Sequence, residues 1–449
     1  MFEPPPPTIF ALASAPGRAG VAVVRISGEG AGRAIDAMAG PRPPPRKALV
    51  RTVRHPQSGE HLDRGLVLWL PAPKSFTGED VVELHLHGGR AVVQVVLSAL
   101  ALLPGLRLAE PGEFARRAFE AGKIDLAEVE GLADLIDAET EGQRRQALAQ
   151  ASGALSDLYD EWRASLIDGL ALIEAGLDFS DEGDVGARTF SEATAVIKAL
   201  VPAVNHHLDD DHRGEILREG FRVALVGPPN AGKSSLLNAL AKRNAAIVSA
   251  EAGTTRDVIE VRLDLGGLPI VVSDTAGLRE AAGEIEQEGM RRSLAVAQAA
   301  DLVLWLTDAS QPQTALPPVL SAVADKTLLI LNKIDLMAGG TAPAALPDDM
   351  VPLSVATGDG FDALVKRIAV IASERIGHHA EPALTQVRHR WLVEQCRDHL
   401  DAFLAGDPDA VELRAEDLRR AADALGRITG RVDVEDVLDQ VFGRFCIGK

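Results

Sequence analysis

One stretch of the sequence, residues 223–235 (VALVGPPNAGKSS), has the residue types and the spacing to bind a triphosphate. It matches G-x-x-x-x-G-K-[ST] between an apolar run that predicts a buried strand and a segment that predicts a helix. Gly227 and Gly232 allow backbone N–H groups to surround a phosphate at the positive end of the helix dipole. Lys233 can reach the outer phosphates, and the Ser234 hydroxyl suits an octahedral Mg²⁺. The expected nucleotide contacts of this loop are Asn230, Ala231, Gly232, Lys233, Ser234 and Ser235.

A later segment indicates which base is bound. Residues 328–331 predict another buried strand, which ends in Asn332, Lys333 and Asp335. An Asp in this place can accept hydrogen bonds from the ring N–H and the amino group of guanine. Adenine lacks this donor pair and would leave a charged acceptor unpaired, at a cost of about 1–3 kcal/mol or more. The segment therefore predicts guanine specificity.

Three further segments complete the expected site. Residues 270–273 predict a strand that leads to Asp274, which would hold Mg²⁺ through water, and to Gly277, whose N–H would contact the γ-phosphate. Residues 253–257 (GTTRD) fit the mobile segment whose Thr, here Thr255, caps the Mg²⁺. A last segment follows a strand and would close over the guanine; it consists of Ser354, Val355 and Ala356. Together the motifs, in this order and spacing, predict a GTPase.

One position departs from the Ras-like pattern. Ras-like GTPases carry a water-orienting Gln directly after the Asp-x-x-Gly motif, and Leu278 occupies that place here. A leucine side chain cannot polarise water. Either hydrolysis is slow, or another group enters the site.

Composition limits the class of protein. The 449 residues leave room for about three domains, with 46% hydrophobic and 25% charged residues, as in ordinary globular proteins. The sequence has no apolar run of membrane-spanning length and no signal pattern, and only two cysteines. We therefore expect a soluble, cytoplasmic protein that does not enter a membrane. The net charge of −19 argues against a broad basic nucleic-acid surface, so any RNA contact would need a local patch or a partner. The Pro-rich basic residues 41–47 favour a stiff linker over an RNA contact.

Hydrophobic periodicity predicts three kinds of domain. Residues 1–120 read as α+β, with strands at 8–13, 20–26, 48–54, 65–70 and 81–87 and a helix at 91–103. Within them, His85 and His87 share a strand face that fits a polar surface better than a metal site, because no third ligand is evident. Residues 121–217 and 376–449 have helical patterns and enclose an α/β domain at 218–375. The expected architecture is an α+β N-terminal domain, an all-α helical domain, and a P-loop GTPase domain of Ras-like type inserted into the helical domain.

The whole chain resembles one family. The resemblance rests on the GTPase motifs and on residues 15–18 (APGR), 21–28 (VAVVRISG), 75–80 (SFTGED), 110–114 (EPGEF), 123–126 (KIDL), 133–137 (ADLID) and 445–449 (FCIGK). These residues resemble the MnmE, or TrmE, family of tRNA-modifying GTPases. The resemblance implies a homodimer that works as a heterotetramer with the FAD-containing protein MnmG. That complex would form a 5-carboxymethylaminomethyl or aminomethyl group on the wobble uridine of certain tRNAs.

The resemblance also implies roles for individual residues. A tetrahydrofolate derivative, in its 5-formyl or 5,10-methylene form, would bind in the N-terminal folate-binding and dimerisation domain, held by Arg25, Glu83, Lys123 and Lys449. Without the resemblance, each of these residues reads as an ordinary surface charge. Cys446, in the C-terminal tail, would be catalytic, although a packing role is left open.

A potassium ion would replace the arginine finger and the missing Gln. Its ligands would be Asn230, Ser249, Thr254 and the backbone carbonyl of Glu251. Glu286 matches the family's water-positioning carboxylate, although the neighbouring Glu284 and Glu288 look the same in this sequence. GTP hydrolysis would thus depend on K⁺ and on dimerisation of the GTPase domains.

Two rival functions share the nucleotide motifs. A ribosome-assembly GTPase should carry a basic RNA-binding module, which neither the motifs nor the acidic balance supports. A purely regulatory switch would lack the N-terminal motifs and the terminal FCIGK. The resemblance favours the tRNA-modifying enzyme.

Overall fold

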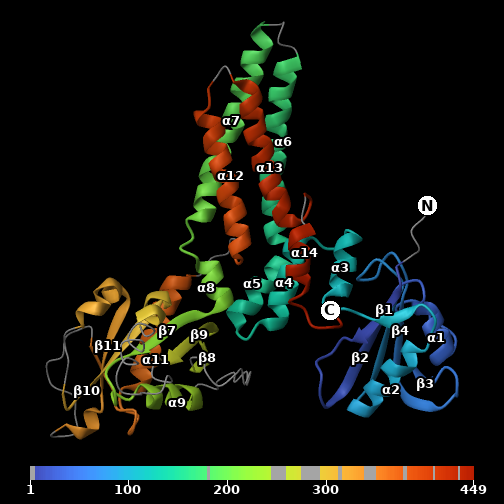
Figure 1. Ribbon diagram of the computed structural model, residues 1–449, viewed down its shortest axis with the longest axis horizontal. Coiled ribbons are helices and arrows are strands. Elements are labelled where there is room, and N and C mark those ends of the chain that lie inside the picture. Colours follow the sequence, from blue (N-terminus) through green and yellow to red (C-terminus); the bar gives the residue numbers. More distant parts are fainter. Residues whose placement is uncertain are drawn as a thin grey trace, which may run out of the picture. The chain divides into compact units, whose positions relative to one another are not determined.

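The computed structural model describes residues 6–178, 183–243, 259–274, 294–311, 316–337, 350–377, 382–407, 410–432 and 435–449 (Figure 1). The chain forms two compact units. The first unit comprises Met1–Ala133, Ala151–Tyr159 and Gly426–Lys449, and the second comprises Asp134–Gln150 and Asp160–Leu425. Both ends of the chain therefore belong to the first unit.

The first unit is built on a mixed sheet with the strand order β3-β4-β5-β2-β1-β6. Neighbouring strands are antiparallel except β1 and β6, which are parallel. The strands are β1 (Thr8–Leu12), β2 (Ala19–Ser27), β3 (Leu49–Arg54), β4 (His61–Leu70), β5 (Val81–Gly88) and β6 (Leu106–Leu108). Arg25 of β2 is the cross-strand partner of Glu83 of β5, so their side chains share one face.

Alternation along these strands gives the sheet two different faces. One face carries Val24, Val67 and Leu84, and it packs against α1 (Ala31–Met38) and α2 (Arg90–Ala101). The opposite face carries Arg25, Glu83 and His85. We call this second side of the sheet the open face.

A smaller apolar cluster holds the C-terminal residues in the first unit. It joins α3 (Glu113–Glu120), the start of α4 (Leu126–Asp137) and α14 (Glu435–Phe442) through Ala115, Leu126, Val441, Phe442 and Phe445. Gly112 must be a glycine, because its φ is 69° and a Cβ would lie 2.3 Å from the carbonyl oxygen of Phe442. The helix before the tail is thus anchored against α3.

The second unit contains a six-stranded sheet with the order β12-β11-β10-β7-β9-β8. All neighbouring pairs are parallel except β8 and β9. The strands are β7 (Phe221–Val226), β8 (Ile259–Leu265), β9 (Leu268–Asp274), β10 (Leu302–Asp308), β11 (Thr327–Asn332) and β12 (Met350–Pro352). After β7 the chain adds β8 and β9 on one side of it and then β10, β11 and β12 on the other, so β7 lies at the topological switch point, where doubly wound folds bind ligands.

Both faces of this sheet are covered, which explains its continuous apolar strands. One core contains Val223, Leu225 and Leu304 with residues of α8 (Arg213–Glu219), α9 (Lys233–Arg243) and α11 (Phe361–Ile376). The other core packs Val226, Val303 and Trp305 against Ala297 and Leu320.

The helices of the second unit form a bundle. It consists of the larger part of α6 (Ala154–Asp178), α7 (Gly183–Leu208), α12 (Val387–Ala405) and most of α13 (Val411–Thr429), and α5 (Glu141–Ala151) lies before it in the chain. The guanidinium of Arg414 lies 4.3 Å from the ring centre of Phe190 and 4.7 Å from that of Phe403, which links α13 to α7 and α12. Among the described residues, no helix is both long and apolar enough to span a membrane.

The architecture expected from the sequence is confirmed, including the α/β GTPase fold and the helical segments on both sides of it. The expected strands and the helix at 91–103 are present, with shifted ends. The periodicity of the N-terminal residues did not indicate α1, β6 or α3. These elements have three or eight residues each, too few for a clear repeat.

Candidate functional site

The loop after β7 has the backbone shape of a phosphate-binding loop. Gly227 has φ +156°, and a Cβ there would lie 2.3 Å from the Leu306 carbonyl oxygen of β10. Gly232 has φ +99°, and a Cβ there would lie 2.3 Å from the side-chain nitrogen of Asn332. Asn230 also has a left-handed backbone, with φ 61°. Only glycine fits at the first two positions, which agrees with the motif.

Two of the residues expected to bind Mg²⁺, Ser234 and Asp274, are among the described residues, and they lie together. Ser234, at the start of α9, donates a hydrogen bond of 2.6 Å from its Oγ to Oδ2 of Asp274, at the end of β9. Asp274 is only 1% exposed. The Nζ of Lys233 donates to the carbonyl oxygens of Gly227 and Pro228, both at 2.9 Å, and so supports the loop from inside.

The residues expected at guanine are joined to the same loop. Asn332, at the end of β11, donates from Nδ2 to the Ala231 carbonyl oxygen at 2.7 Å, and its Oδ1 accepts from the Val355 backbone N–H at 3.4 Å. The hydroxyl of the buried Ser354 donates to Oδ1 of Asp335 at 2.5 Å. The phosphate loop, the base motif and the closing segment after β12 therefore lie at one edge of the sheet. Ser235 and Ala356 are exposed at this edge.

One contact at this edge was not expected from the sequence. Nζ of Lys333 lies 2.7 Å from Oδ2 of Asp308, the last residue of β10. The hydrogen bond from Lys333 lowers the pKa of Asp308 to about 2. The sequence feature that could have indicated this contact is the acidic residue directly after the apolar strand of residues 302–307. The pair restrains the stem of Lys333, whose backbone is left-handed with φ 64°.

Several expected site residues lie outside the described residues. They are Gly277 of the phosphate contacts, Thr255 of the Mg²⁺ site, Ser249, Glu251 and Thr254 of the K⁺ site, and Glu286, the expected catalytic carboxylate. Their roles stay predictions. Among the described residues, no group of three or more His, Cys, Asp or Glu could hold a metal ion.

A second constellation lies on the open face of the N-terminal sheet. The guanidinium of Arg25 pairs with Glu83 through Nη2 and Oε1 at 3.0 Å, and Nε2 of His85 lies 3.1 Å from Oε2 of Glu83. Burial raises the pKa of Glu83, but the hydrogen bond with His85 and the charge of Arg25 outweigh it, so the net shift is downward. The other strand histidine, His87, pairs separately with Asp63.

The C-terminal tail of the same chain reaches this ion pair. The Phe114 backbone N–H donates to the Lys449 carbonyl oxygen at 3.2 Å, and Ile447 forms a β-bridge with Pro111. Gly448 has φ +106°, and a Cβ there would lie 2.0 Å from the Leu12 carbonyl oxygen. Burial, and then the charge of Arg25, lower the pKa of the Lys449 ammonium, whereas Cys446 and Glu83 raise it. The tail therefore lies on the N-terminal domain of its own chain.

The two cysteines differ in environment. Cys396 is buried, and burial raises the pKa of its thiol to about 12, as for an inert packing residue. Cys446 is exposed, and its carbonyl oxygen accepts a hydrogen bond from the Lys449 backbone N–H at 3.3 Å. Of the two, Cys446 has the access that chemistry requires.

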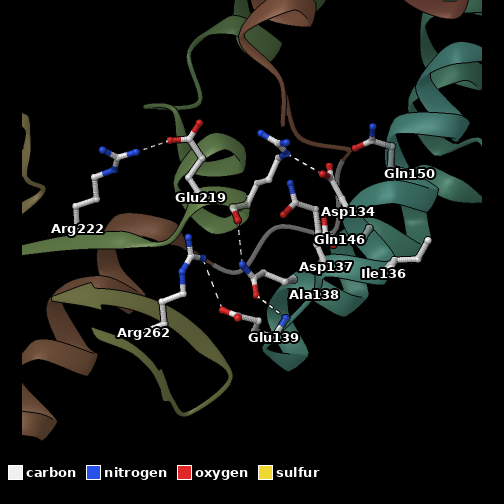
Figure 2. Close-up of a pocket in the computed structure, with 13 residues that line it drawn as sticks. Asp134, Ile136, Asp137, Ala138, Glu139, Gln146, Gln150, Glu219, Arg222 and Arg262 are labelled. Carbon is white, nitrogen blue, oxygen red and sulfur yellow. Dashed lines mark hydrogen bonds and ion pairs between the residues drawn. The ribbon is translucent and has the colours of Figure 1, made fainter. Parts of the chain in front are cut away.

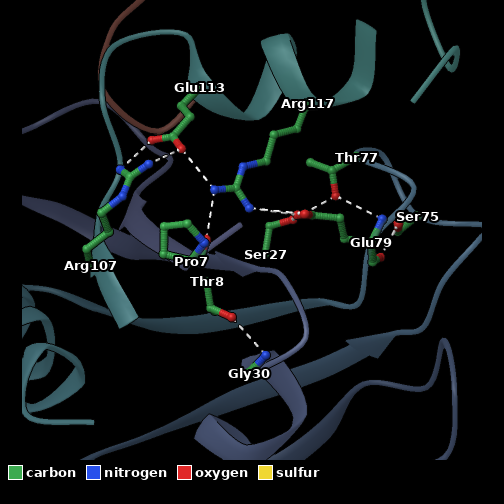
Figure 3. Close-up of polar contacts among 10 residues, drawn as sticks. All are labelled: Pro7, Thr8, Ser27, Gly30, Ser75, Thr77, Glu79, Arg107, Glu113 and Arg117. Atoms are coloured by element: carbon green, nitrogen blue, oxygen red, sulfur yellow. Dashed lines mark hydrogen bonds and ion pairs between the residues drawn. The ribbon is translucent and has the colours of Figure 1, made fainter. Parts of the chain in front are cut away.

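Aromatic rings and a buried polar network support the Arg25 side chain. Its guanidinium lies 5.8 Å from the ring centre of Phe76 and 5.7 Å from that of Phe114. The loop of Phe76 is held by Arg117, which donates to Glu79 at 3.1 Å, to Glu113 at 2.9 Å and to the Pro7 carbonyl oxygen at 2.8 Å (Figure 3). Further members of this network are Ser27, Thr77 and Arg107. The network is the part of the site that motif reading missed, because it joins residues far apart in the sequence.

Lys123 lies elsewhere on this unit. Its backbone N–H donates to the Ala118 carbonyl oxygen at the end of α3, and its Cε lies 3.2 Å from the place a Cβ would take on Gly78. Its side chain is exposed. The structure thus brings Arg25, Glu83 and Lys449 together and sets Lys123 beside the loop of residues 75–80.

The second unit has a polar cavity of about 810 Å³ between α5, α8 and the hairpin of β8 and β9 (Figure 2). Its walls are ion pairs: Arg218 with Asp134 at 2.8 Å, Arg222 with Glu219 at 2.9 Å, and Arg262 with Glu139 at 3.6 Å. Each arginine that lines the cavity has a carboxylate partner, and the ion pairs Arg218–Asp134 and Arg262–Glu139 connect separate elements around it.

Comparisons with known proteins agree with these features. A family model described as the MnmE helical domain matches residues 126–446, and one described as the GTP-binding protein TrmE N-terminus matches residues 8–123. The chain is 55% identical to a tRNA modification GTPase MnmE of Parvibaculum lavamentivorans, over 98% of this chain and 100% of that one. It is 49% identical to the MnmE of Rhodopseudomonas palustris, over 100% of both chains.

Among solved structures, the FeoB G-domain from Methanococcus jannaschii is 26% identical, over 34% of this chain and 98% of that one, with a TM-score of 0.27. The sheet order and the geometry of the phosphate loop show the GTPase fold of this chain. Two family models and full-length relatives at about half identity decide the assignment: the chain belongs to the MnmE family of tRNA modification GTPases.

Proposed function

We propose that this protein hydrolyses GTP and, with the FAD-containing protein MnmG, modifies the wobble uridine of certain tRNAs in the cytoplasm. The product would be a 5-carboxymethylaminomethyl or aminomethyl group. The proposed domains are an N-terminal domain (1–120), a helical domain (121–217 and 376–449) and a GTPase domain (218–375). Family membership supports the GTPase and tRNA parts of the proposal.

The observation that carries the modification chemistry is the convergence of the C-terminal tail on the Arg25–Glu83 ion pair. The donor set fits a folate: a carboxylate and two cations beside two aromatic rings suit the polar edge of a pterin and the carboxylates of a glutamate tail. A bound tetrahydrofolate would supply the one-carbon unit. In this proposal Arg25, Glu83 and Lys449 orient the folate, and Lys123 contacts it from its place beside the loop of residues 75–80. The exposed Cys446 acts at the reacting group.

GTP hydrolysis is proposed to use Mg²⁺ and K⁺. The bond between Ser234 and Asp274 supports a Mg²⁺ position at the phosphate loop, where the ion would neutralise charge on the β- and γ-phosphates. Asn230 is exposed at the turn of that loop, as a shared K⁺ ligand at a dimer interface would need to be. We expect hydrolysis to be much faster in K⁺ than in Na⁺ at equal ionic strength, and Asn230→Ala to remove the difference. Equal rates for the unmutated protein would refute the K⁺ proposal.

The homodimer is proposed to form through the open face of the N-terminal sheet. Two exposed apolar side chains lie on this face: Val50 (56% exposed) and Leu66 (40%). Leu66 is the cross-strand partner of both Val50 and His85, so the apolar surface adjoins Glu83. Neighbouring exposed apolar residues beside a polar site are typical of an interaction surface.

The tail provides the test of the modification chemistry. We expect deletion of residues 446–449 to leave GTP binding and K⁺-stimulated hydrolysis nearly unchanged, because these depend on the second unit. Wobble modification with MnmG, measured by mass spectrometry of digested tRNA, should fall to background. Cys446→Ser in the intact tail is the matched variant that separates the thiol from the anchoring contacts. Normal modification by the truncated protein would refute the proposed role of the tail.

A further inference from the structure

The N-terminal domain contains a concentration of positive charge that the proposed chemistry does not use. Residues 30–74 include eight Lys or Arg and three Asp or Glu, a net charge of +5 in a chain whose net charge is −19. The open-face ion pair of Arg25 and Glu83 lies outside this range. A polyanion approaching this acidic protein would therefore meet favourable charge here.

Five of these cations form a cluster, which we call the basic cluster: Arg33, Arg42, Arg46, Lys47 and Lys74. The guanidinium carbon of Arg42 lies only 2.5 Å from the place a Cβ would take on Gly32, next to the exposed Arg33 of α1. The same guanidinium lies 5.2 Å from the ring centre of Trp69. The Trp69 carbonyl oxygen accepts a hydrogen bond from the Arg46 backbone N–H at 2.8 Å, and Nη2 of Arg46 donates to the Lys74 carbonyl oxygen. These contacts link α1, the segment 41–47 and the turn after β4.

The segment 41–47, which reads as a stiff linker in the sequence, is an ordered connection between α1 and β3 inside one domain. Arg46 has a left-handed backbone, with φ 61°, and the Lys47 N–H donates to the Pro44 carbonyl oxygen at 3.1 Å. The four prolines of the segment restrict its backbone further. The cations of this segment are therefore largely positioned before any ligand binds, which lowers the entropy cost of binding.

One carboxylate partly balances the cluster. Asp36 pairs with Nη2 of Arg42 at 3.0 Å, which holds the arginine over Gly32. The side chains of Arg33, Lys47 and Lys74 are exposed. Ammonium and guanidinium groups presented in this way contact phosphates without reading sequence.

We propose that the basic cluster binds the phosphate backbone of the tRNA substrate and so orients it on the N-terminal domain. This inference rests on the proposed function, which supplies the tRNA. An RNA backbone fits better than an acidic protein surface, because the cations are spread over three segments and a chain of regularly repeated phosphates can meet all of them. Binding through such contacts should fall steeply with salt.

The test is tRNA binding by the triple variant Arg33→Gln/Lys47→Gln/Lys74→Gln, which keeps the structural contacts of Arg42 and Arg46. We expect the Kd for unmodified tRNA at about 0.1 M salt to rise by about an order of magnitude, and the slope of log Kd against log salt to fall by about two to three. The matched control neutralises three exposed cations of the helical bundle, Arg188→Gln/Lys198→Gln/Arg420→Gln. Differential scanning calorimetry on both variants reports that both units are folded, and GTP hydrolysis reports that the second unit is intact.

The outcomes separate the inference from the proposed function. Unchanged tRNA affinity in the triple variant, or an equal loss of affinity in the control, contradicts the proposed role of the basic cluster, while the proposed function stands. If the triple variant loses MnmG affinity but keeps tRNA affinity, the surface serves a protein and the inference is wrong. If the unmutated protein binds no tRNA, alone or with MnmG, both the inference and the proposed function fail. A loss confined to the triple variant, with reduced salt dependence, supports the proposal.

Discussion

At the residue scale, the proposed base specificity depends on how Asp335 is held. Its Oδ1 accepts the Ser354 hydroxyl at 2.5 Å, and Asn332 ties the same edge to the phosphate loop through Ala231. An oriented carboxylate at this place can accept two donors of guanine. Ser354 is fully buried, so its hydroxyl depends on Asp335 as an acceptor.

We therefore expect Asp335→Asn to weaken GTP binding and to favour xanthosine triphosphate, whose 2-oxo group needs a donor. The shift in preference should correspond to at least about 1–3 kcal/mol, the range for an unpaired buried polar group. Competition binding with both nucleotides measures it, and Asp359→Asn, at an exposed carboxylate nearby, is the control. An unchanged preference would remove Asp335 from the base site.

Glu83 gives a prediction about pH. Its pKa is lowered from 4.5, so its ionised form stabilises the folded state above pH 4.5, and this contribution is lost as the pH falls below 4.5. Glu83→Gln should lower the unfolding temperature of the first unit at pH 7. The difference in unfolding temperature from the unmutated protein should shrink as the pH falls from 5 to 3. Differential scanning calorimetry across this range checks it, with Glu60→Gln as the control at an exposed turn. A difference that does not change with pH would contradict the assignment.

At the element scale, the hairpin of β8 and β9 joins the nucleotide site to α5. One end of β9 is Asp274, which binds Ser234, and the hairpin tip places the Gly267 carbonyl oxygen 2.9 Å from the Gly142 N–H at the start of α5. Arg262 of β8 also reaches Glu139, just before α5 (Figure 2). This partly exposed ion pair is worth at most about 1 kcal/mol, so the backbone contact is the better target for a test.

Gly142→Ala should displace the hairpin tip, because a Cβ there would lie 2.8 Å from the Gly267 carbonyl oxygen. Alanine also favours the helix, so we expect α5 to persist. The free energy of unfolding should fall by about 1 kcal/mol, the contribution of one hydrogen bond. GTP hydrolysis should be nearly normal, whereas modification of tRNA with MnmG should fall severalfold. Gly169→Ala, where the new Cβ makes only ordinary contacts from 3.4 Å, is the matched control. Normal modification by Gly142→Ala would rule out this connection between the elements.

At the scale of the whole molecule, the segment by which the chain enters the inserted GTPase domain contacts the segment by which it leaves. Arg390 of α12 donates to Asp210 at 2.5 Å, to Glu215 at 2.7 Å and to the Leu208 carbonyl oxygen at 3.0 Å. The segment after the GTPase domain is therefore bound to the segment before it. Gly214 of α8 permits the close approach, because a Cβ there would lie 2.2 Å from the Leu384 carbonyl oxygen.

Assembly gives a prediction at the same scale. If the open face forms the homodimer, Val50→Asp/Leu66→Asp should give a monomer, because two carboxylates would have to be buried unpaired in the interface. Light scattering after size exclusion measures the mass, and Leu102→Asp, at an exposed apolar residue after α2, should leave it unchanged. A dimer that persists in the double variant would contradict an interface on this face.

The sequence alone predicted the chemistry of the nucleotide site and indicated the order of the domains. Phosphate loops and base motifs are short and contiguous, so their residue types and spacing state what they bind, and strands buried on both faces are visible as apolar runs. Both kinds of signal are local. For this reason the loop glycines, Asp274, Asn332 and Asp335 could be named before their geometry was known.

Only the tertiary structure decided which distant residues meet. Arg25 and Glu83 are cross-strand neighbours, yet 58 residues separate them, and the tail that reaches them lies at the other end of the chain. Spacing in the sequence says nothing about register between strands or about the packing of α14 against α3, because these depend on the burial of whole faces. The same reason explains the Arg117 network and the basic cluster, whose members come from separate segments and become a surface only when the sheet and its helices are assembled.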